Sequence, residues 1–278
     1  MSRPPLAALL GGLALILGCG DSRVSTLTPP PTDLPLTVDQ AARFQGLRIV
    51  FGHQSVGGNL VDGLSRLATA GEPVPLSIQR TLQVEGASPG VLAHEWIGEN
   101  GAPASKLAAF GAALDGPARG ANVGIVKFCY SDFGPETDPE GLFQEYARQV
   151  REWQSLHPGI TFVHITAPAV RPEGTVSRWV RTLRGRMTMR ERATKVARYN
   201  ARLREAYAGR EPVFDLAAHE AAGPSGRATG FRAGGTEVPL LHPAFTDDGE
   251  HLNGPGRVAV ARKFLRFLAD SVSAAVVR

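Results

Sequence analysis

The sequence has little cysteine: Cys19 and Cys129 are the only two in 278 residues. Because Cys19 ends an apolar N-terminal stretch, the rest of the chain holds a single thiol, and no disulfide can form within its fold. Cys129 follows an apolar segment, which predicts a buried, inert thiol. The histidines outside the motifs described below show no metal-ligand spacing with Asp or Glu. The sequence therefore predicts neither a catalytic metal nor another cofactor.

Long hydrophobic runs are also scarce. Residues 6–17 form an uncharged apolar run behind Arg3, too short to span a bilayer comfortably. This pattern predicts a secretory signal rather than a transmembrane helix. The run ends in Gly18-Cys19-Gly20, which resembles the lipobox of bacterial lipoproteins. The resemblance implies that Cys19 becomes the lipidated first residue of the mature chain; ordinary signal cleavage beside an incidental cysteine is the alternative.

The composition divides the chain into three segments. Residues 1–18 are the expected signal peptide, and residues 19–40, rich in Thr and Pro, are an expected extended tether. Residues 41–278 are the expected single domain, and a hydrophobic fraction of 43% supports a substantial core. We therefore expect an exported protein anchored by lipid in the cell envelope, periplasmic or on the outer surface. The residue after Cys19 is not Asp, which leaves the membrane leaflet open.

Arginine gathers between residues 171 and 210, although the net charge is only +4. One interpretation is an anion-binding surface for acidic lipid, polysaccharide or nucleic acid. The other is a helix with a solvated basic face, and its apolar stripe would consist of Met189, Val196, Tyr199, Leu203 and Tyr207. We favour the solvated face, because no recognition motif accompanies the charge, and we expect no nucleic-acid partner.

Strand-like and helix-like segments alternate in the domain. Apolar runs at 47–51, 75–81, 121–129, 160–166 and 212–216 predict five strands, and residues 83–103 between the second and third are a predicted long glycine-rich loop. Residues 137–140 predict a capping box that opens a helix, and Asn253 or Gly254 is the predicted cap of the last helix. Strands separated by helices need right-handed crossovers. The fold class is therefore α/β, with a parallel sheet covered on both faces.

Ser55 stands where the first strand gives way to a helix. It ends the motif Gly52-His53-Gln54-Ser55, and Leu60, Leu64 and Leu67 follow at helical spacing. A serine there lies at the crevice where open α/β sheets bind ligands. The backbone N–H groups of Ser55 and around Gly58 could stabilise an oxyanion.

A base for this serine is found near the other end of the domain. Asp248 and His251 are three residues apart in a glycine-containing loop before the last helix. Together with Ser55 they would form a nucleophile, a base and an orienting acid. Asp215 is an alternative orienting acid. His53 is interpreted as a hydrogen-bonding loop residue that lines the pocket, and an alternative base is the bolder interpretation.

These two motifs resemble those of the SGNH (GDSL-type) serine hydrolases. The resemblance spans roughly residues 45–272 and implies a three-layer α/β/α fold with a five-stranded, flavodoxin-like sheet. It departs from the family at Gln54, where Asp is usual, and at residues 129–132, which stand in place of Gly-x-Asn-Asp. Ser131 thus occupies the place of the family's oxyanion-hole Asn. Either Ser131 or Asn100 would supply the donor, and Asp132 is counted with the substrate-binding residues.

The sequence therefore predicts a lipid-anchored serine esterase acting on a carboxylic ester, with an O-acyl group on a carbohydrate as a plausible substrate. Two alternatives remain open. The chain could be a non-catalytic envelope protein that uses the same scaffold to bind glycan or a protein partner. It could also be an O-acyltransferase, which would use the same three residues and pass the acyl group to a sugar hydroxyl instead of water.

Overall fold

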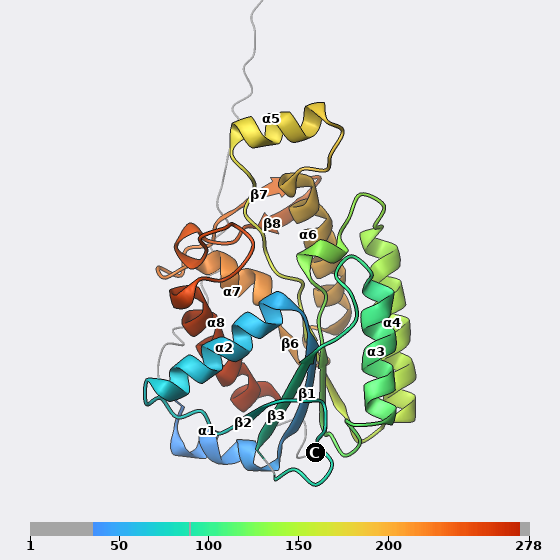
Figure 1. Cartoon of the computed structure of the whole chain (residues 1–278), viewed down its shortest axis with the longest axis vertical. Coiled ribbons are helices and arrows are strands. Elements are labelled where there is room, and N and C mark those ends of the chain that lie inside the picture. The colour runs from blue at the N-terminus through green and yellow to red at the C-terminus, as the bar shows by residue number, and fades with distance from the viewer. Residues whose placement is uncertain (1–35, 89, 273–278) are drawn as a thin grey trace, which may run out of the picture.

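A parallel sheet covered by helices on both faces forms the centre of the structure (Figure 1). A computed structural model describes residues 36–88 and 90–272, so the predictions for residues 1–35, the lipidated Cys19 included, lie outside the described residues. The strand order is β2-β3-β1-β4-β5-β6, and all neighbours pair in parallel. The strands are β1 (Arg48–His53), β2 (Ser77–Arg80), β3 (Val91–Trp96), β4 (Val123–Val126), β5 (Thr161–Ile165) and β6 (Val213–Phe214).

The helices form the outer layers of this α/β fold. In Figure 1, α2 and α8 lie on one side of the sheet and α3 and α4 on the other. None of the helices in the described ranges is long and apolar enough to cross a membrane. The helices are α1 (Val38–Ala42), α2 (Ser55–Thr69), α3 (Pro103–Asp115), α4 (Pro139–Leu156), α5 (Thr175–Leu183), α6 (Met189–Tyr207), α7 (Leu216–Ala222) and α8 (Gly254–Phe267).

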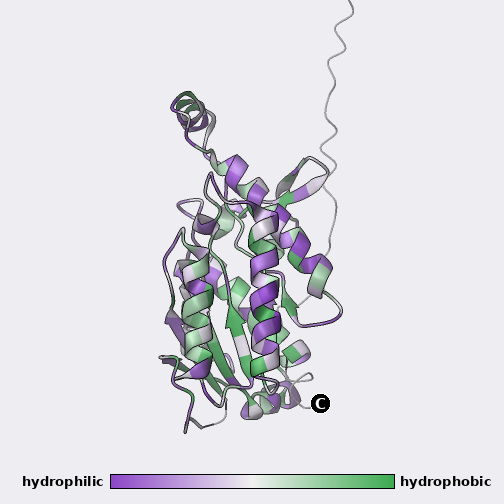
Figure 2. Cartoon of the chain, turned by 90° about the vertical axis from the view of Figure 1, so that its right-hand side faces the viewer, coloured by the Kyte–Doolittle hydropathy of each residue, from purple (hydrophilic) through white to green (hydrophobic). Residues whose placement is uncertain are grey.

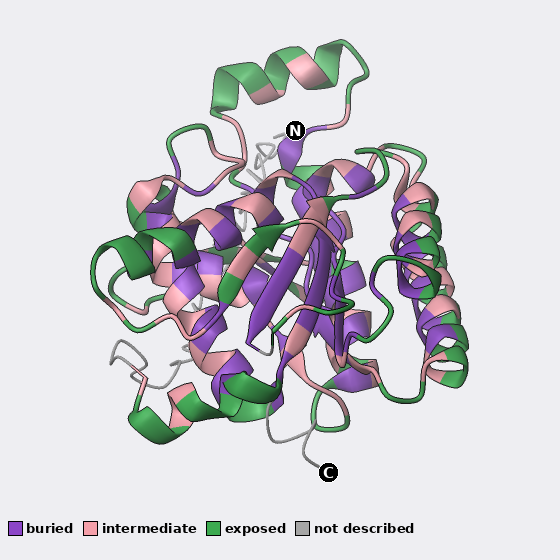
Figure 3. Cartoon of the chain, turned by 60° about the horizontal axis from the view of Figure 1, so that its bottom comes forward, coloured by how far each residue is buried: buried purple, intermediate pink, exposed green. Residues whose placement is uncertain are grey.

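The core lies between the sheet and these helices. The strands are coloured mainly as hydrophobic in Figure 2 and as buried in Figure 3. Ile49, Val50 and Phe51 of β1 are completely buried. A parallel strand that is buried on both faces reads as a continuous apolar run, which is why its sequence identified it without ambiguity.

The predicted strand count was one too low. The strand that was not predicted is β3. It lies in the segment expected to be a long loop and pairs between β2 and β1 in the sheet. Only Val91, Leu92 and Ala93 are apolar and buried there, and polar residues follow at once. So short a run resembles loop sequence, and only pairing on both sides makes it a strand.

Two other local features differ from expectation. The side chain that caps α4 is Asp138, which accepts hydrogen bonds from the N–H groups of Glu140 and Gly141. Thr137 instead donates to the Asp132 carbonyl, so the predicted capping box is wrong by one residue. The chain also forms an antiparallel hairpin of β7 (Gly230–Ala233) and β8 (Thr236–Pro239), whose short, partly exposed strands gave no clear apolar pattern.

The arginine-rich segment contains two different helices. The apolar stripe predicted for it belongs to α6, and all five of its residues are buried, which confirms the stripe. The preceding helix α5 has no buried residue. Its apolar side chains point into solvent, which the stripe prediction did not anticipate.

Helices α2 and α8 pack closely because of Gly63. A Cβ atom at this position would lie 2.3 Å from the Arg257 carbonyl oxygen and 2.6 Å from Cβ of Ala261, both in α8. Backbone atoms cannot swing away as the end of a long side chain can. Gly63 therefore sets the separation of α2 and α8.

We expect Gly63→Ala to destabilise the fold. Alanine favours a helix by up to about 1 kcal/mol over glycine, but overpacking costs roughly 1–3 kcal/mol, and the backbone contact makes the second effect larger. The denaturant midpoint should fall by the equivalent of about 1–2 kcal/mol. Gly159→Ala is the control, because a Cβ there meets nothing within 4 Å. An unchanged midpoint in Gly63→Ala would contradict this account of the α2–α8 contact.

Candidate active site

Ser55 lies at the point where β1 ends and α2 begins. Gln54 is the extended N-cap residue of α2, and Ser55 is its first helical residue. In the sheet, β1 is flanked by β3 and β4. The hydroxyl is thus placed at the carboxyl edge of the sheet, where α/β folds bind ligands.

The structure brings Ser55, His251 and Asp248 into hydrogen-bond contact. The Ser55 Oγ atom is 3.1 Å from His251 Nε2, and His251 Nδ1 is 2.7 Å from Asp248 Oδ2. An ionised carboxylate only accepts hydrogen bonds, so the imidazole proton belongs on Nδ1. Nε2 is then free to accept the proton of the serine hydroxyl. This is the geometry of a nucleophile, a base and an orienting acid.

Asp248 is held as a carboxylate by its own loop. Burial would by itself raise the pKa of Asp248. The backbone N–H groups of His251 and Glu250, each 2.8 Å from Oδ1, and the His251 ring oppose this and hold the pKa well below its usual range. The same N–H contacts close the turn, so the acid both orients the ring and shapes the loop that carries it.

Asn59 connects this loop to the serine helix. Its Oδ1 atom accepts the Leu252 N–H at 3.1 Å, and its side chain is buried. Asn59 is one helical turn after Ser55, on the same side of α2. Asn59 was not among the predicted site residues, although an Asn inside an apolar helical pattern was the available signal.

Two aromatic side chains flank the Ser55–His251 pair. The Tyr130 ring meets the His251 ring edge to face, with centroids 5.9 Å apart, and the Tyr130 hydroxyl donates to Glu250 Oε2 at 2.6 Å. On the other side of β1, Trp96 ends β3 and remains 55% exposed. Its Nε1 atom is 3.8 Å from where a Cβ of Gly58 would lie. Neither aromatic residue was among the predicted site residues.

His53 is not a pocket-lining loop residue as predicted. It is the last residue of β1 and is completely buried. Its Nδ1 atom is 2.8 Å from the Gln54 carbonyl oxygen, and its Nε2 atom is 3.0 Å from His94 Nδ1. A Cβ at Gly57 would lie 2.3 Å from the His53 Cβ, so glycine lets α2 start directly over this ring. The role of His53 is to support the start of α2.

The backbone donors are a narrower set than predicted. The Gly58 N–H makes the first intrahelical hydrogen bond of α2, to the Gln54 carbonyl at 3.0 Å. It is therefore not available to an oxyanion, which corrects the prediction for Gly58. The N–H groups of Ser55, Val56 and Gly57 precede that bond and have no partner within the helix.

Asn100 is joined to the serine through Gln54. The Gln54 side-chain amide donates to the carbonyls of Ile97 and Gly98, each at 2.8 Å, and so fixes the loop that follows β3. Lys106 Nζ donates to Asn100 Oδ1 at 3.1 Å. This contact shows which end of the Asn100 amide is the oxygen. Asn100 is exposed, and its Nδ2 group remains as a hydrogen-bond donor.

Ser131 and Asp132 lie deeper than Asn100. The Ser131 Oγ atom is buried and has no hydrogen-bond partner among the described residues. Asp132 is completely buried, and it accepts from Lys106 Nζ at 2.5 Å and from the N–H groups of Gly101 and Cys129. Asp132 therefore supports the loops around the site, and the prediction that it contacts substrate is wrong.

Asp215 is engaged elsewhere. Arg204 donates two hydrogen bonds to its carboxylate, at 2.6 and 2.8 Å, and the Ala218 N–H donates a third at the start of α7. Since Asp248 contacts the His251 ring, the alternative of Asp215 as orienting acid is wrong.

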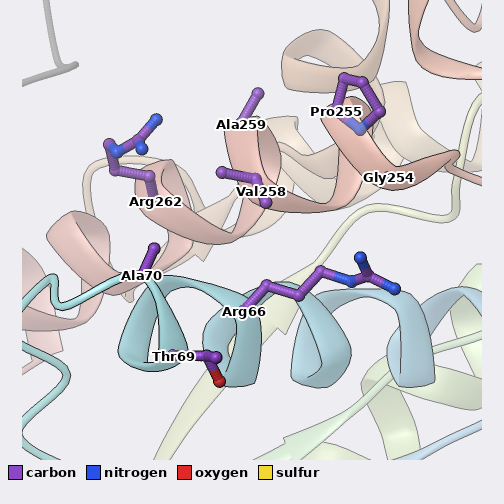
Figure 4. Close-up of a pocket in the computed structure, with 8 residues that line it drawn as sticks. All are labelled: Arg66, Thr69, Ala70, Gly254, Pro255, Val258, Ala259 and Arg262. Atoms are coloured by element: carbon purple, nitrogen blue, oxygen red, sulfur yellow. The ribbon is translucent and has the colours of Figure 1, made fainter.

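The structure also has an open hollow of about 690 Å³ between α2 and α8 (Figure 4). Ser55, Asp248 and His251 are not among the residues that line it. The lining consists of arginine, threonine and small apolar residues, without a histidine or a carboxylate. The candidate site is therefore the group of residues in contact around Ser55. Among the described residues, no three His, Cys, Asp or Glu side chains are grouped to hold a metal ion.

Comparison with known proteins does not assign the chain to a family. No family model and no curated protein match the sequence. Among solved structures it is similar to a protein described as a platelet activating factor from Streptococcus pneumonia, with 14% identity over 84% of this chain and 90% of that one and a TM-score of 0.46. It is also similar to an acetyl esterase mutant with an acetate ion, with 9% identity over 81% of this chain and 98% of that one and a TM-score of 0.42. A possible lipase from Chitinophaga pinensis has 14% identity over 79% of this chain and 96% of its own, with a TM-score of 0.34. Likenesses this distant define no activity.

The burial of His53 predicts a loss of stability in acid. Desolvation lowers the pKa of His53 to about 3, against 6.5 for an exposed histidine. Between these values the unfolded chain binds a proton that the folded chain does not, so stability is complete above pH 6.5 and falls as the pH falls. For this one group the loss between pH 7 and pH 4 should be about 3 kcal/mol.

The free energy of unfolding, measured by denaturant titration at pH 7 and pH 4, tests this. In His53→Gln the loss between the two pH values should shrink by about the His53 contribution, whatever the stability at pH 7. His157, at the end of α4, keeps a fifth of its side chain exposed, unlike the fully buried His53, so His157→Gln should keep the full pH dependence. Identical pH dependence in all three proteins would contradict the assignment to His53.

Proposed function

We propose that this protein is a serine hydrolase that cleaves a carboxylic ester. The observation that carries the proposal is the continuous hydrogen-bonded series from Asp248 through His251 to the Ser55 hydroxyl. Hydroxyl groups are poor nucleophiles unless a base of suitable pKa takes their proton. A tautomer-fixed imidazole within reach of a serine at the edge of a parallel sheet supports this chemistry better than it supports passive binding.

The reaction would proceed in two stages. The Ser55 Oγ attacks the acyl carbon while its proton moves to His251 Nε2, and the resulting imidazolium is stabilised by the Asp248 carboxylate. The tetrahedral intermediate collapses, the alcohol leaves with the proton from Nε2, and the acyl group stays on Ser55. Water then repeats the same steps, with His251 as the base, and releases the carboxylic acid and free serine.

Asn100 is the side-chain oxyanion donor that the contacts support. Its amide oxygen accepts from Lys106, so its N–H groups are directed elsewhere. Gln54, the residue before Ser55, holds the loop of Asn100 through the carbonyls of Ile97 and Gly98. The Ser131 hydroxyl is enclosed and less suited to meet a substrate. The N–H groups of Ser55, Val56 and Gly57 at the start of α2 would supply the backbone part of the same hole.

The substrate proposal rests on Trp96. It lies beside the first turn of α2 and is 55% exposed, and an exposed aromatic face suits the apolar face of a sugar ring or a short acyl chain. The Tyr130 ring is buried and packs against His251 instead. An O-acylated carbohydrate therefore remains our preferred substrate class. As the lipobox-like sequence suggests, we further propose that Cys19 anchors the enzyme to a membrane of the cell envelope.

Removal of the Ser55 hydroxyl should abolish turnover. For Ser55→Ala we expect kcat on a short-chain aryl ester to fall by more than about 10⁴-fold, because the nucleophile is lost. Ser65→Ala, on the same helix, should retain full activity, since Ser65 donates only to the Val61 carbonyl. An unchanged denaturant midpoint would show that both variants fold. Turnover by Ser55→Ala at the normal rate would eliminate the proposal.

The oxyanion donor can be identified by kcat. Asn100→Ala should lower kcat by roughly 10²–10³-fold, whereas Ser131→Ala should have a much smaller effect. Asn100→Asp should be as impaired as Asn100→Ala, because a carboxylate cannot donate. The opposite ranking, with Ser131→Ala the slower enzyme, would move the assignment to Ser131.

A further inference from the structure

Helix α5 stands apart from the body of the protein. It follows β5, leaves the carboxyl edge of the sheet and projects beyond the other helices in Figures 1 and 3. A nine-residue helix without buried residues gains nothing from core packing. Since isolated helices this short are marginal in water, its amphipathic sequence calls for another physical reason.

The apolar face of α5 points into solvent. Its side chains are exposed to the following extents: Val176 78%, Trp179 67%, Val180 40% and Leu183 71%. These four positions recur at intervals of three and four and share one side of the helix. Of the seven large hydrophobic residues that are exposed in the described chain, four lie in this helix. An apolar patch of this kind marks a surface that meets another apolar phase.

The opposite face of α5 is held by the two segments that flank the helix. Arg181 donates to the Met187 carbonyl and forms an ion pair with Glu173 at 3.5 Å. Glu173 in turn accepts the N–H of Met189, the first residue of α6. These polar contacts hold the helix with its apolar side outward, which is the reverse of a helix that packs on its own domain.

The charge around the apolar face is entirely basic. Residues 175–188 contain four arginines and no acidic residue. Arg184 and Arg186 are exposed, and Arg178 is partly exposed. A short helix that combines a tryptophan, aliphatic residues and arginines is typical of helices that lie in the interface of an anionic bilayer. The aliphatic side chains enter the acyl region, the tryptophan stays at the headgroup level, and the arginines meet lipid phosphates.

We propose that α5 docks this protein onto the surface of a membrane that contains anionic phospholipid. The inserted face consists of Val176, Trp179, Val180 and Leu183, and Arg184 and Arg186 contact phosphates. This interaction is separate from any lipid on the N-terminus and does not depend on catalysis.

Docking through α5 would also orient the candidate active site. The segment between β5 and α5 hydrogen-bonds to the loop of Asp248 and His251, because the Arg171 N–H donates to the Gly249 carbonyl at 2.8 Å. Both α5 and Ser55 thus belong to the carboxyl edge of the sheet. A membrane bound at α5 would face that edge rather than the opposite end of the domain.

Tryptophan quenching by brominated lipids tests the proposal with the full chain. Vesicles of phosphatidylglycerol and phosphatidylcholine with brominated acyl chains should quench the fluorescence, and phosphatidylcholine alone should quench far less. The quenching should vanish in Trp179→Phe and persist in Trp96→Phe, although both tryptophans are exposed. Equal quenching in the two variants, or quenching that does not need the anionic lipid, would overturn the proposal.

Matched pairs of variants separate α5 from general surface effects. Val176→Ser/Leu183→Ser should raise the lipid concentration needed for half-maximal quenching by at least about tenfold. Val38→Ser/Leu156→Ser, which alters exposed residues of the same types in α1 and α4, should not. Arg184→Gln/Arg186→Gln should weaken binding by roughly fivefold for each charge, while Arg119→Gln/Arg210→Gln, at the other end of the sheet, should have little effect.

Two results would refute membrane docking in these pairs. One is an equal response of the α5 variants and their controls. The other is a protein that does not bind vesicles but self-associates in solution, with the self-association abolished by Val176→Ser/Leu183→Ser. In that case α5 would be an interface between copies of the chain. Activity on a soluble ester should be unchanged in all α5 variants. Loss of membrane binding is therefore distinguished from a failure of the proposed hydrolase function.

Discussion

The close packing of α2 on α8 is the constraint on which the candidate site depends. Ser55 begins α2, and His251 lies just before α8, so two residues that are far apart in sequence can meet only if these helices are held in register. Gly63 sets their separation by removing the side chain that would strike the α8 backbone. The Asn59–Leu252 hydrogen bond then fixes the histidine loop to the same face of α2. A shift of one ångström in this contact would separate the hydroxyl from the imidazole.

A second set of buried contacts orients the opposite side of the site. Asp132 and Lys106 form an ion pair that is completely shielded from solvent, and such a pair is seldom a net source of stability. Here it has a positional consequence, because Lys106 also holds the Asn100 oxygen and Asp132 holds the Gly101 N–H. Gln54 reaches the same loop from the serine side. The polar core thus determines where the amide of Asn100 points.

Much of the fold could be predicted from sequence, and the reasons are local. Strands such as β1 are buried on both faces and read as apolar runs, and the stripe of α6 repeats at helical spacing. The contact of Ser55, Asp248 and His251 was predicted from the two motifs together. Ser55 follows β1 at the carboxyl edge of the sheet, and the loop of Asp248 and His251 reaches it because α8 packs on α2. Their catalytic role remains a prediction. The predictions that failed concern features that depend on tertiary surroundings. β3 has only three buried apolar residues and resembled a loop, and His53 also resembled a loop residue. The Gly58 N–H was predicted to bind an oxyanion, but it makes a hydrogen bond within α2. The exposure of α5 could not be foreseen, because an amphipathic pattern does not state which way its apolar face points.

The most direct test of the hydrolase account is covalent labelling by a fluorophosphonate, with the modified residue located by peptide mass spectrometry. Such probes react with a serine only when a neighbouring base activates it. The account predicts one adduct on Ser55 of the folded protein and its loss in His251→Ala, with Ser65 and Ser131 unmodified. A folded protein that leaves Ser55 unmodified, or that is labelled equally well without the His251 imidazole, would contradict it.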